Sequence, residues 1–142
     1  MSKTAHTVGD LVDAMESIAP THLAESWDNV GLIVGDRATK LSSILLTIDY
    51  TQSVALEARE IGANAIVAYH PPIFDPLKRI TNDRNTELIF DAIRRGISLY
   101  SPHTALDVVE DGTNDALADA VALIDRTPLK PRVGSSNEFK LI

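Results

Sequence analysis

Two histidines and one aspartate stand just after short apolar segments of the chain. The polar residues are Asp49, His70 and His103, and the apolar segments are residues 43–48, 65–68 and 97–100, respectively. If these segments are parallel strands, their carboxyl ends lie at one edge of a sheet, where open α/β folds bind ligands. Imidazole nitrogens and carboxylate oxygens suit zinc, iron, manganese or nickel, without choosing among them. The spacing therefore predicts a metal or ligand site at this edge.

Asp107 extends this set because it follows His103 by four residues. On one helical turn the two side chains would face the same way. They could then share a metal ion, or the carboxylate could orient the imidazole. Near His70, the prolines at positions 71 and 72 stiffen the following loop.

Several of these residues also have simpler interpretations. A single histidine at a strand end is often a hydrogen-bonded structural residue. Asp49 could only cap a helix that begins near Thr51. Lys78 and Arg79 could meet phosphate groups near His70, or they could lie in a solvated surface loop.

The elements that would position these residues alternate between helices and strands. Helices are expected over residues 8–18, 51–62, 86–95 and 114–123, and strands over residues 31–34, 43–48, 65–68 and 97–100. Thr7 followed by Asp10 resembles a capping box, and Gly96 stands where a helix should end. The alternation predicts an α/β fold with a mainly parallel sheet flanked by helices, and right-handed crossovers would point all strands the same way. The apolar run 43–48 is typical of a strand buried on both faces.

Composition limits the classes of function. The chain has 142 residues, 44% of them hydrophobic, which fits one domain. We expect residues 1–125 to form it, and residues 126–142 to form a loop and the start of a strand that leads into a missing C-terminal part. The formal net charge of −7 argues against non-specific nucleic-acid binding. There is no cysteine, so a metal site must use His, Asp, Glu and water.

The compartment is also suggested by the sequence. The apolar runs are too short for a membrane span, and the N-terminus resembles neither a secretory signal nor a transit peptide. We therefore expect a soluble, membrane-free protein of the cytoplasm, with the nucleus or mitochondrion as alternatives.

Three motifs carry a family resemblance. They are ESWDNVGL at residues 25–32, YHPPIF at residues 69–74 and SPHTALD at residues 101–107. In this order they resemble the NGG-one interacting factor three-like family, whose bacterial members are often labelled GTP cyclohydrolase I type 2 homologs. The resemblance covers almost the whole chain from Val8 onward. It implies an α/β unit built from the two ends of a longer chain, a ring-shaped homo-hexamer, and a site for two metal ions. Matched residue by residue, it implies His70 and Asp107 as metal ligands, and His103 as a ligand or a neighbour of the ligands.

The chain departs from the family pattern at two places. Tyr69 stands where many members have the first histidine of a His-His pair, as in the eukaryotic branch, and a phenol is a poor ligand at neutral pH. The family's C-terminal histidine and glutamate have no counterpart before residue 142. We therefore expect an N-terminal portion of the family fold that binds metal weakly alone and is marginally stable or associates.

Two functions follow as hypotheses. The first is a metal-dependent hydrolase-like protein that acts on a nucleotide or a phosphorylated small molecule, with a metal-bound hydroxide as the attacking group. The alternative is a non-enzymatic interaction scaffold or transcriptional regulatory partner with protein ligands, which the tyrosine at position 69 favours. No catalytic residue and no organic cofactor is assigned.

Overall fold

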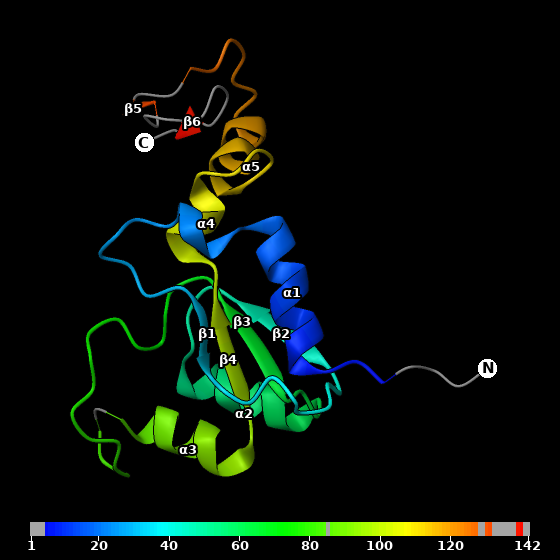
Figure 1. The fold of residues 1–142 in the computed structure, drawn as a ribbon, viewed down its shortest axis with the longest axis vertical. Coiled ribbons are helices and arrows are strands. Elements are labelled where there is room, and N and C mark those ends of the chain that lie inside the picture. The colour runs from blue at the N-terminus through cyan, green and yellow to red at the C-terminus, as the bar shows by residue number, and fades with distance from the viewer. Residues whose placement is uncertain (1–4, 85, 128–129, 132–138, 141–142) are drawn as a thin grey trace.

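The structure is a computed structural model that describes residues 5–84, 86–127, 130–131 and 139–140. The helices are α1 (Val8–Ile18), the 3-10 helix η1 (Thr21–Leu23), α2 (Gln52–Glu60), α3 (Glu87–Arg95), α4 (His103–Asp107) and α5 (Thr113–Ala120). The strands are β1 (Gly31–Val34), β2 (Ile44–Thr47), β3 (Ala65–Ala68), β4 (Ser98–Ser101), β5 (Lys130–Pro131) and β6 (Phe139–Lys140). Figure 1 shows a central sheet with helices around it.

The central sheet has the strand order β1-β4-β3-β2. Strands β2, β3 and β4 are parallel, as predicted, while β1 pairs with β4 in the antiparallel direction. The expectation that all strands point the same way is therefore wrong for β1. The handedness rule concerns crossovers between parallel strands. A stretch without a helix joins β1 to β2, so that rule does not govern the direction of β1.

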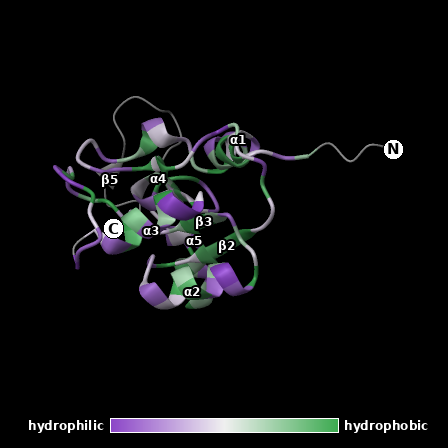
Figure 2. Cartoon of the chain, turned by 90° about the horizontal axis from the view of Figure 1, so that it is seen from below, coloured by the Kyte–Doolittle hydropathy of each residue, from purple (hydrophilic) through white to green (hydrophobic). Residues whose placement is uncertain are grey.

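Helices cover the sheet from both sides, with α1 on one face and α2 on the other (Figure 2). On the first face, Leu11 of α1 packs with Val67 and Tyr100. On the second face, helices α2 and α3 pack against Ile66 and Leu99. Alternate residues of the inner strands thus point into two separate cores, which gives the α/β architecture predicted from the sequence.

Strand β2 differs from its prediction because it lies at the edge of the sheet and is not buried on both faces. Leu46 is 73% exposed, and Ile44 and Ile48 are also exposed. Leu46 is in register with Val67, so it lies on the α1 face of the sheet. Helix α1 packs over β1, β3 and β4 and leaves this face of β2 uncovered.

Local signals set several of the element ends as predicted. The Thr7 side chain accepts from the backbone N–H of Asp10, whose carboxylate accepts from the Thr7 N–H, so the capping box is confirmed. Thr51 caps α2 by accepting from the N–H of Val54. Gly96 ends α3 in the left-handed conformation, with φ of 67°.

Towards the C-terminus the agreement is partial. The last predicted helix ends earlier than expected, at Ala120. Strand β5 pairs antiparallel with β6, while the rest of the predicted loop and strand start after residue 127 lies outside the described residues. Within the described part of the chain, no helix is long and apolar enough to cross a membrane.

Candidate functional site

Three aromatic side chains meet at the carboxyl ends of the parallel strands. Tyr69 and His70 follow β3, and His103 follows β4, its neighbour in the sheet. The ring centroids of the two histidines are 5.6 Å apart, and the Tyr69 ring lies 5.0 Å from His70 and 5.5 Å from His103. The structure thus brings the two predicted histidines together at the predicted edge.

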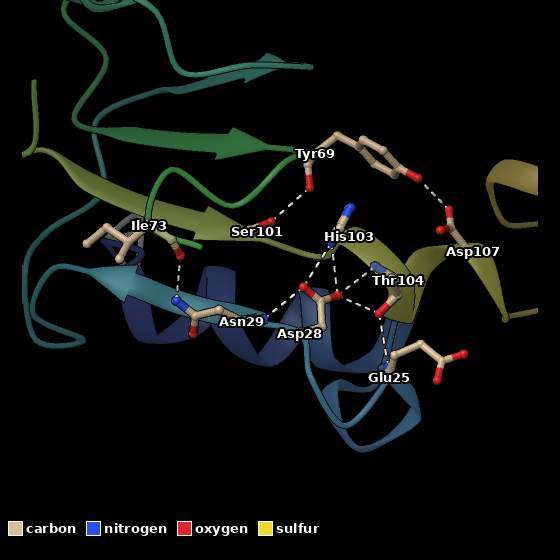
Figure 3. A network of polar contacts seen from close by, with 9 residues as sticks. All are labelled: Glu25, Asp28, Asn29, Tyr69, Ile73, Ser101, His103, Thr104 and Asp107. Carbon is tan, nitrogen blue, oxygen red and sulfur yellow. Dashed lines mark hydrogen bonds and ion pairs between the residues drawn. The ribbon is translucent and has the colours of Figure 1, made fainter. Parts of the chain in front are cut away.

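His103 is held by the buried side chain of an aspartate that lies 75 residues earlier in the sequence (Figure 3). The Nδ1 atom of His103 lies 2.9 Å and 3.0 Å from the two carboxylate oxygens of Asp28, whose side chain is 0% exposed. The same carboxylate accepts from the backbone N–H of Thr104 at 3.1 Å, from the Thr104 hydroxyl, and from the N–H of Asn29 at 2.8 Å. Because a carboxylate can only accept, Nδ1 of His103 carries the proton, and in the neutral form of the ring the lone pair is on Nε2.

These bonds decide the charge of Asp28. Burial by itself would raise the pKa of this carboxyl, but the hydrogen bonds from Thr104, His103 and Asn29 outweigh burial and hold the pKa below its usual value. Asp28 is therefore ionised at neutral pH and fixes both the tautomer and the direction of the imidazole.

The backbone at His103 is unusual as well. His103 is the first residue of α4 and has φ of 27°, a conformation that side-chain-bearing residues rarely adopt. Such strain persists only where surrounding contacts hold it, and it concentrates at functional sites. Here the contacts are those to Asp28 on both His103 and Thr104.

His70 is held in a more open way. Its Nδ1 atom lies 2.7 Å from Oδ1 of Asp49, and both side chains are largely exposed. The interpretation of Asp49 as the cap of α2 is therefore wrong, because Thr51 fills that position. Each of the two histidines has a carboxylate at Nδ1, which leaves its Nε2 atom for another partner.

Asp107 is bound to Tyr69 and does not pair with His103. The Tyr69 hydroxyl donates to Oδ1 of Asp107 at 2.6 Å, and Asn114 donates to the Asp107 backbone carbonyl at 2.8 Å. Burial, followed by the hydrogen bond and the charge of Asp107, raises the pKa of Tyr69 to about 12. The predicted helical turn from His103 to Asp107 is present as α4, but its two ends have different partners.

A divalent metal ion is implied by the family resemblance, and the residues fit it in type but not in number. Two imidazoles oriented by carboxylates, with a third carboxylate nearby, are typical transition-metal ligands. Among residues 5–84, 86–127 and the two short terminal strands, however, no three His, Asp or Glu side chains are arranged to hold a metal ion. His70, His103 and Asp107 therefore form at most part of a metal site.

Asp28, Asn29 and Thr104 are the site residues that the sequence-based reasoning did not single out. The reason is the direction of β1. The N-terminal end of an antiparallel strand lies at the same edge as the carboxyl ends of its parallel neighbours, so the segment before Gly31 reaches the site. The Asp-Asn pair, separated from β1 by Val30, is the signal in the sequence, but it points to this edge only if β1 is antiparallel.

Comparisons of the sequence with known proteins identify relatives of this chain. The chain is 46% identical over 127 residues to NIF3-like protein 1 of Drosophila melanogaster, an alignment that covers 88% of this chain and 44% of that protein. It is 38% identical over 140 residues to a GTP cyclohydrolase 1 type 2 homolog of Clostridium perfringens, with 94% and 53% covered. The chain thus spans about half the length of these relatives.

Solved structures give the same result. A Bacillus cereus protein related to NIF3 has a TM-score of 0.86 and 35% identity, with 92% of this chain and 36% of that chain covered. Reduced HcgD from Methanocaldococcus jannaschii has a TM-score of 0.81 and 30% identity, with 89% and 51% covered. A family model described as Duf34/NIF3 (NGG1p interacting factor 3) matches residues 6–141, and the chain belongs to this family.

Proposed function

We propose that this chain supplies part of the site of a metal-dependent hydrolase-like protein that acts on a nucleotide or a phosphorylated small molecule. The observation that carries the proposal is the pair of histidines, His70 and His103, with ring centroids 5.6 Å apart and a carboxylate at each Nδ1. Carboxylates in this position orient metal-binding imidazoles and make them more basic. The name of the Clostridium perfringens relative, a GTP cyclohydrolase 1 type 2 homolog, supports the same class of function.

In this proposal His70, His103 and Asp107 would hold a divalent transition metal of the group zinc, iron, manganese and nickel. A bound metal of this kind lowers the pKa of a coordinated water to near neutrality and so supplies a nucleophile. Asp28 and Asp49 keep the Nδ1 atoms protonated, which directs each Nε2 lone pair to the metal side. Further ligands would come from outside the described residues, either from additional chain or from another copy in a ring-shaped homo-hexamer.

Metal content tests the proposal directly. We expect the purified protein to take up Zn²⁺ in equilibrium dialysis, and His70→Ala and Asp107→Ala to take up much less when the bound metal is measured by plasma mass spectrometry. His22→Ala is the matched control, because His22 is exposed and lies outside the histidine cluster. A metal content that is the same in all four proteins, or absent throughout, would refute a metal site at these residues.

A specific contact favours a second candidate, a non-enzymatic interaction scaffold. Tyr69 occupies Oδ1 of Asp107 at 2.6 Å and stands where a family ligand is expected from the resemblance. The substitution Tyr69→His separates the two functions. If the wild-type site is a working metal site, the variant gains little affinity for Zn²⁺ by calorimetry. If Tyr69 has disabled it, Zn²⁺ binding appears only in the variant.

A further inference from the structure

Two large aromatic side chains lie exposed beside the histidine cluster. Trp27 is 60% exposed and Phe74 is 53% exposed. Their ring centroids are 6.1 Å apart and their planes are tilted by 53°. Trp27 is the single tryptophan of the chain. An adjacent pair of this size left in water marks a binding surface better than a single exposed apolar residue does.

The loops that carry the two rings are fixed, although the rings themselves are exposed. The side chain of Asp28, next to Trp27, is fully buried and accepts from the backbone N–H of Thr104. The side-chain N–H of Asn29 donates to the backbone carbonyl of Ile73 at 2.7 Å and so joins the Trp27 loop to the Phe74 loop. Figure 3 shows this bond beside the Asp28 network. A surface preorganised in this way loses little entropy when a ligand binds.

The aromatic pair continues into the histidine cluster. The Trp27 ring lies 6.4 Å from the His103 ring, edge-on at 75°, and His103 lies 5.6 Å from His70. A small molecule that rests on Trp27 therefore has the imidazoles within reach of its substituents.

We propose that Trp27 and Phe74 form a stacking surface for a planar heteroaromatic ring, such as a nucleobase. This proposal rests on the function proposed above only in taking the ring to be part of the substrate. Because the planes are tilted, a ring that stacks on one of the two faces meets the other side chain at an angle, and offset and edge-to-face contacts are the geometries that aromatic rings prefer. The imidazoles beside the surface can bond polar groups attached to the ring, which favours a heteroaromatic ligand over a pure hydrocarbon.

The single tryptophan makes the test specific to this site. We would titrate the full chain with adenosine and guanosine and follow Trp27 fluorescence, using ribose 5-phosphate as a probe that lacks an aromatic ring. N-acetyl-tryptophanamide, titrated in parallel, corrects for light absorbed by the nucleosides. Saturable quenching by a nucleoside but not by ribose 5-phosphate is the expected result. Quenching that matches the free fluorophore would overturn the proposal.

The variant Phe74→Leu keeps an apolar side chain but removes the second ring. We expect the dissociation constant of the nucleoside to rise about tenfold, the size of a typical stacking contribution. Phe90→Leu is the matched control, since Phe90 lies on α3, away from the strand ends that carry the site (Figure 1), and contacts Arg94. An equal dissociation constant in wild type and Phe74→Leu would refute the stacking surface. Circular dichroism of both variants verifies that they are folded.

Two further measurements distinguish the stacking surface from the proposed metal site and from an interface between copies of the chain. Nucleoside binding should persist after chelation with EDTA, so the stacking proposal survives if the metal proposal fails. Metal binding without nucleoside binding would refute the stacking surface and leave the metal proposal intact. Acrylamide should quench Trp27 efficiently. If it does not, the ring is covered by another copy of the chain, and the surface is an interface instead of a ligand site.

Discussion

Replacing Asp28 by asparagine exchanges one carboxylate oxygen for an N–H₂ group and should disturb the site strongly. The carboxylate accepts from His103, Thr104 and Asn29 and has no exposure to water. An amide keeps one accepting oxygen and places an N–H₂ group where the second oxygen was. If the oxygen faces Thr104, the N–H₂ group faces Nδ1 of His103 and the N–H of Asn29. Nδ1 of His103 can then donate only to the oxygen that faces Thr104, 3.0 Å away, and the Asn29 N–H loses its acceptor.

The cost can be worked out from these contacts. One orphaned buried donor costs about 1–3 kcal/mol, and each of the two bonds from Thr104 weakens by about 1 kcal/mol when its acceptor loses the charge. We therefore expect Asp28→Asn to lower the free energy of unfolding by about 3–5 kcal/mol, or the melting temperature by about 10 °C or more.

Urea unfolding at neutral pH measures this loss, and Asp13→Asn is the control. Asp13 forms an ion pair with Arg37 at 2.5 Å, but its side chain is 71% exposed, so its loss should cost about 1 kcal/mol or less. Equal losses in Asp28→Asn and Asp13→Asn would refute the reasoning. Nitrogen NMR of the imidazole gives a second readout, because Nδ1 of His103 loses one of its two accepting oxygens and the fraction of rings protonated at Nδ1 should fall in Asp28→Asn.

The pH dependence of this difference has a defined sign. Because the folded-state pKa of Asp28 lies below the model-peptide value of 3.8, its stabilisation is fully present above that value. It is lost as the pH falls through the folded pKa. The gap in stability between wild type and Asp28→Asn should therefore be constant near neutrality and shrink below a pH of about 4.

Other changes give smaller or more local effects. The pKa of Tyr69 is about 12 in the folded state and 10.0 in the unfolded chain, so this residue stabilises the fold below pH 10 and the contribution is lost as the pH rises towards 12. Tyr69→Phe should therefore flatten the alkaline decline in melting temperature. Gly35 has φ of 135°, and Gly35→Ala would place a Cβ 2.8 Å from the Cβ of Ser98, so it should lower the free energy of unfolding in urea by about 2 kcal/mol or more. Gly62→Ala, with open space around it, should lower it by only about 1 kcal/mol. Leu99→Ala, in the core beneath α3, should cost about 2–5 kcal/mol by the same method, and a loss below 1 kcal/mol would contradict the packing described.

The sequence predicted those features that depend on local chemistry. The Thr7–Asp10 capping box and the glycine end of α3 depend on residues a few positions apart, and both are confirmed. The meeting of His70 and His103 was predictable because it follows from two parallel strands alone.

Features that depend on distant pairing could not be predicted in this way. The direction of β1 is decided by its pairing with β4, about which the residues 31–34 contain no signal. With that direction unknown, Asp28 could not be placed beside His103. Burial of β2 was overestimated for a similar reason, since an apolar strand has the same pattern whether or not a helix covers its outer face.

The antiparallel pairing of β1 with β4 also sets the order of events in folding. Gly31 pairs with Ser101, so this contact closes the longest loop within the central sheet, while β2, β3 and β4 join through nearer segments. Long-range pairings pay more loop-closure entropy and tend to form late. Asp28 precedes β1 and His103 follows β4, so the buried Asp28–His103 pair can assemble only once that last strand has docked. Stopped-flow refolding followed by Trp27 fluorescence should therefore report completion of the sheet and assembly of the site as one kinetic phase.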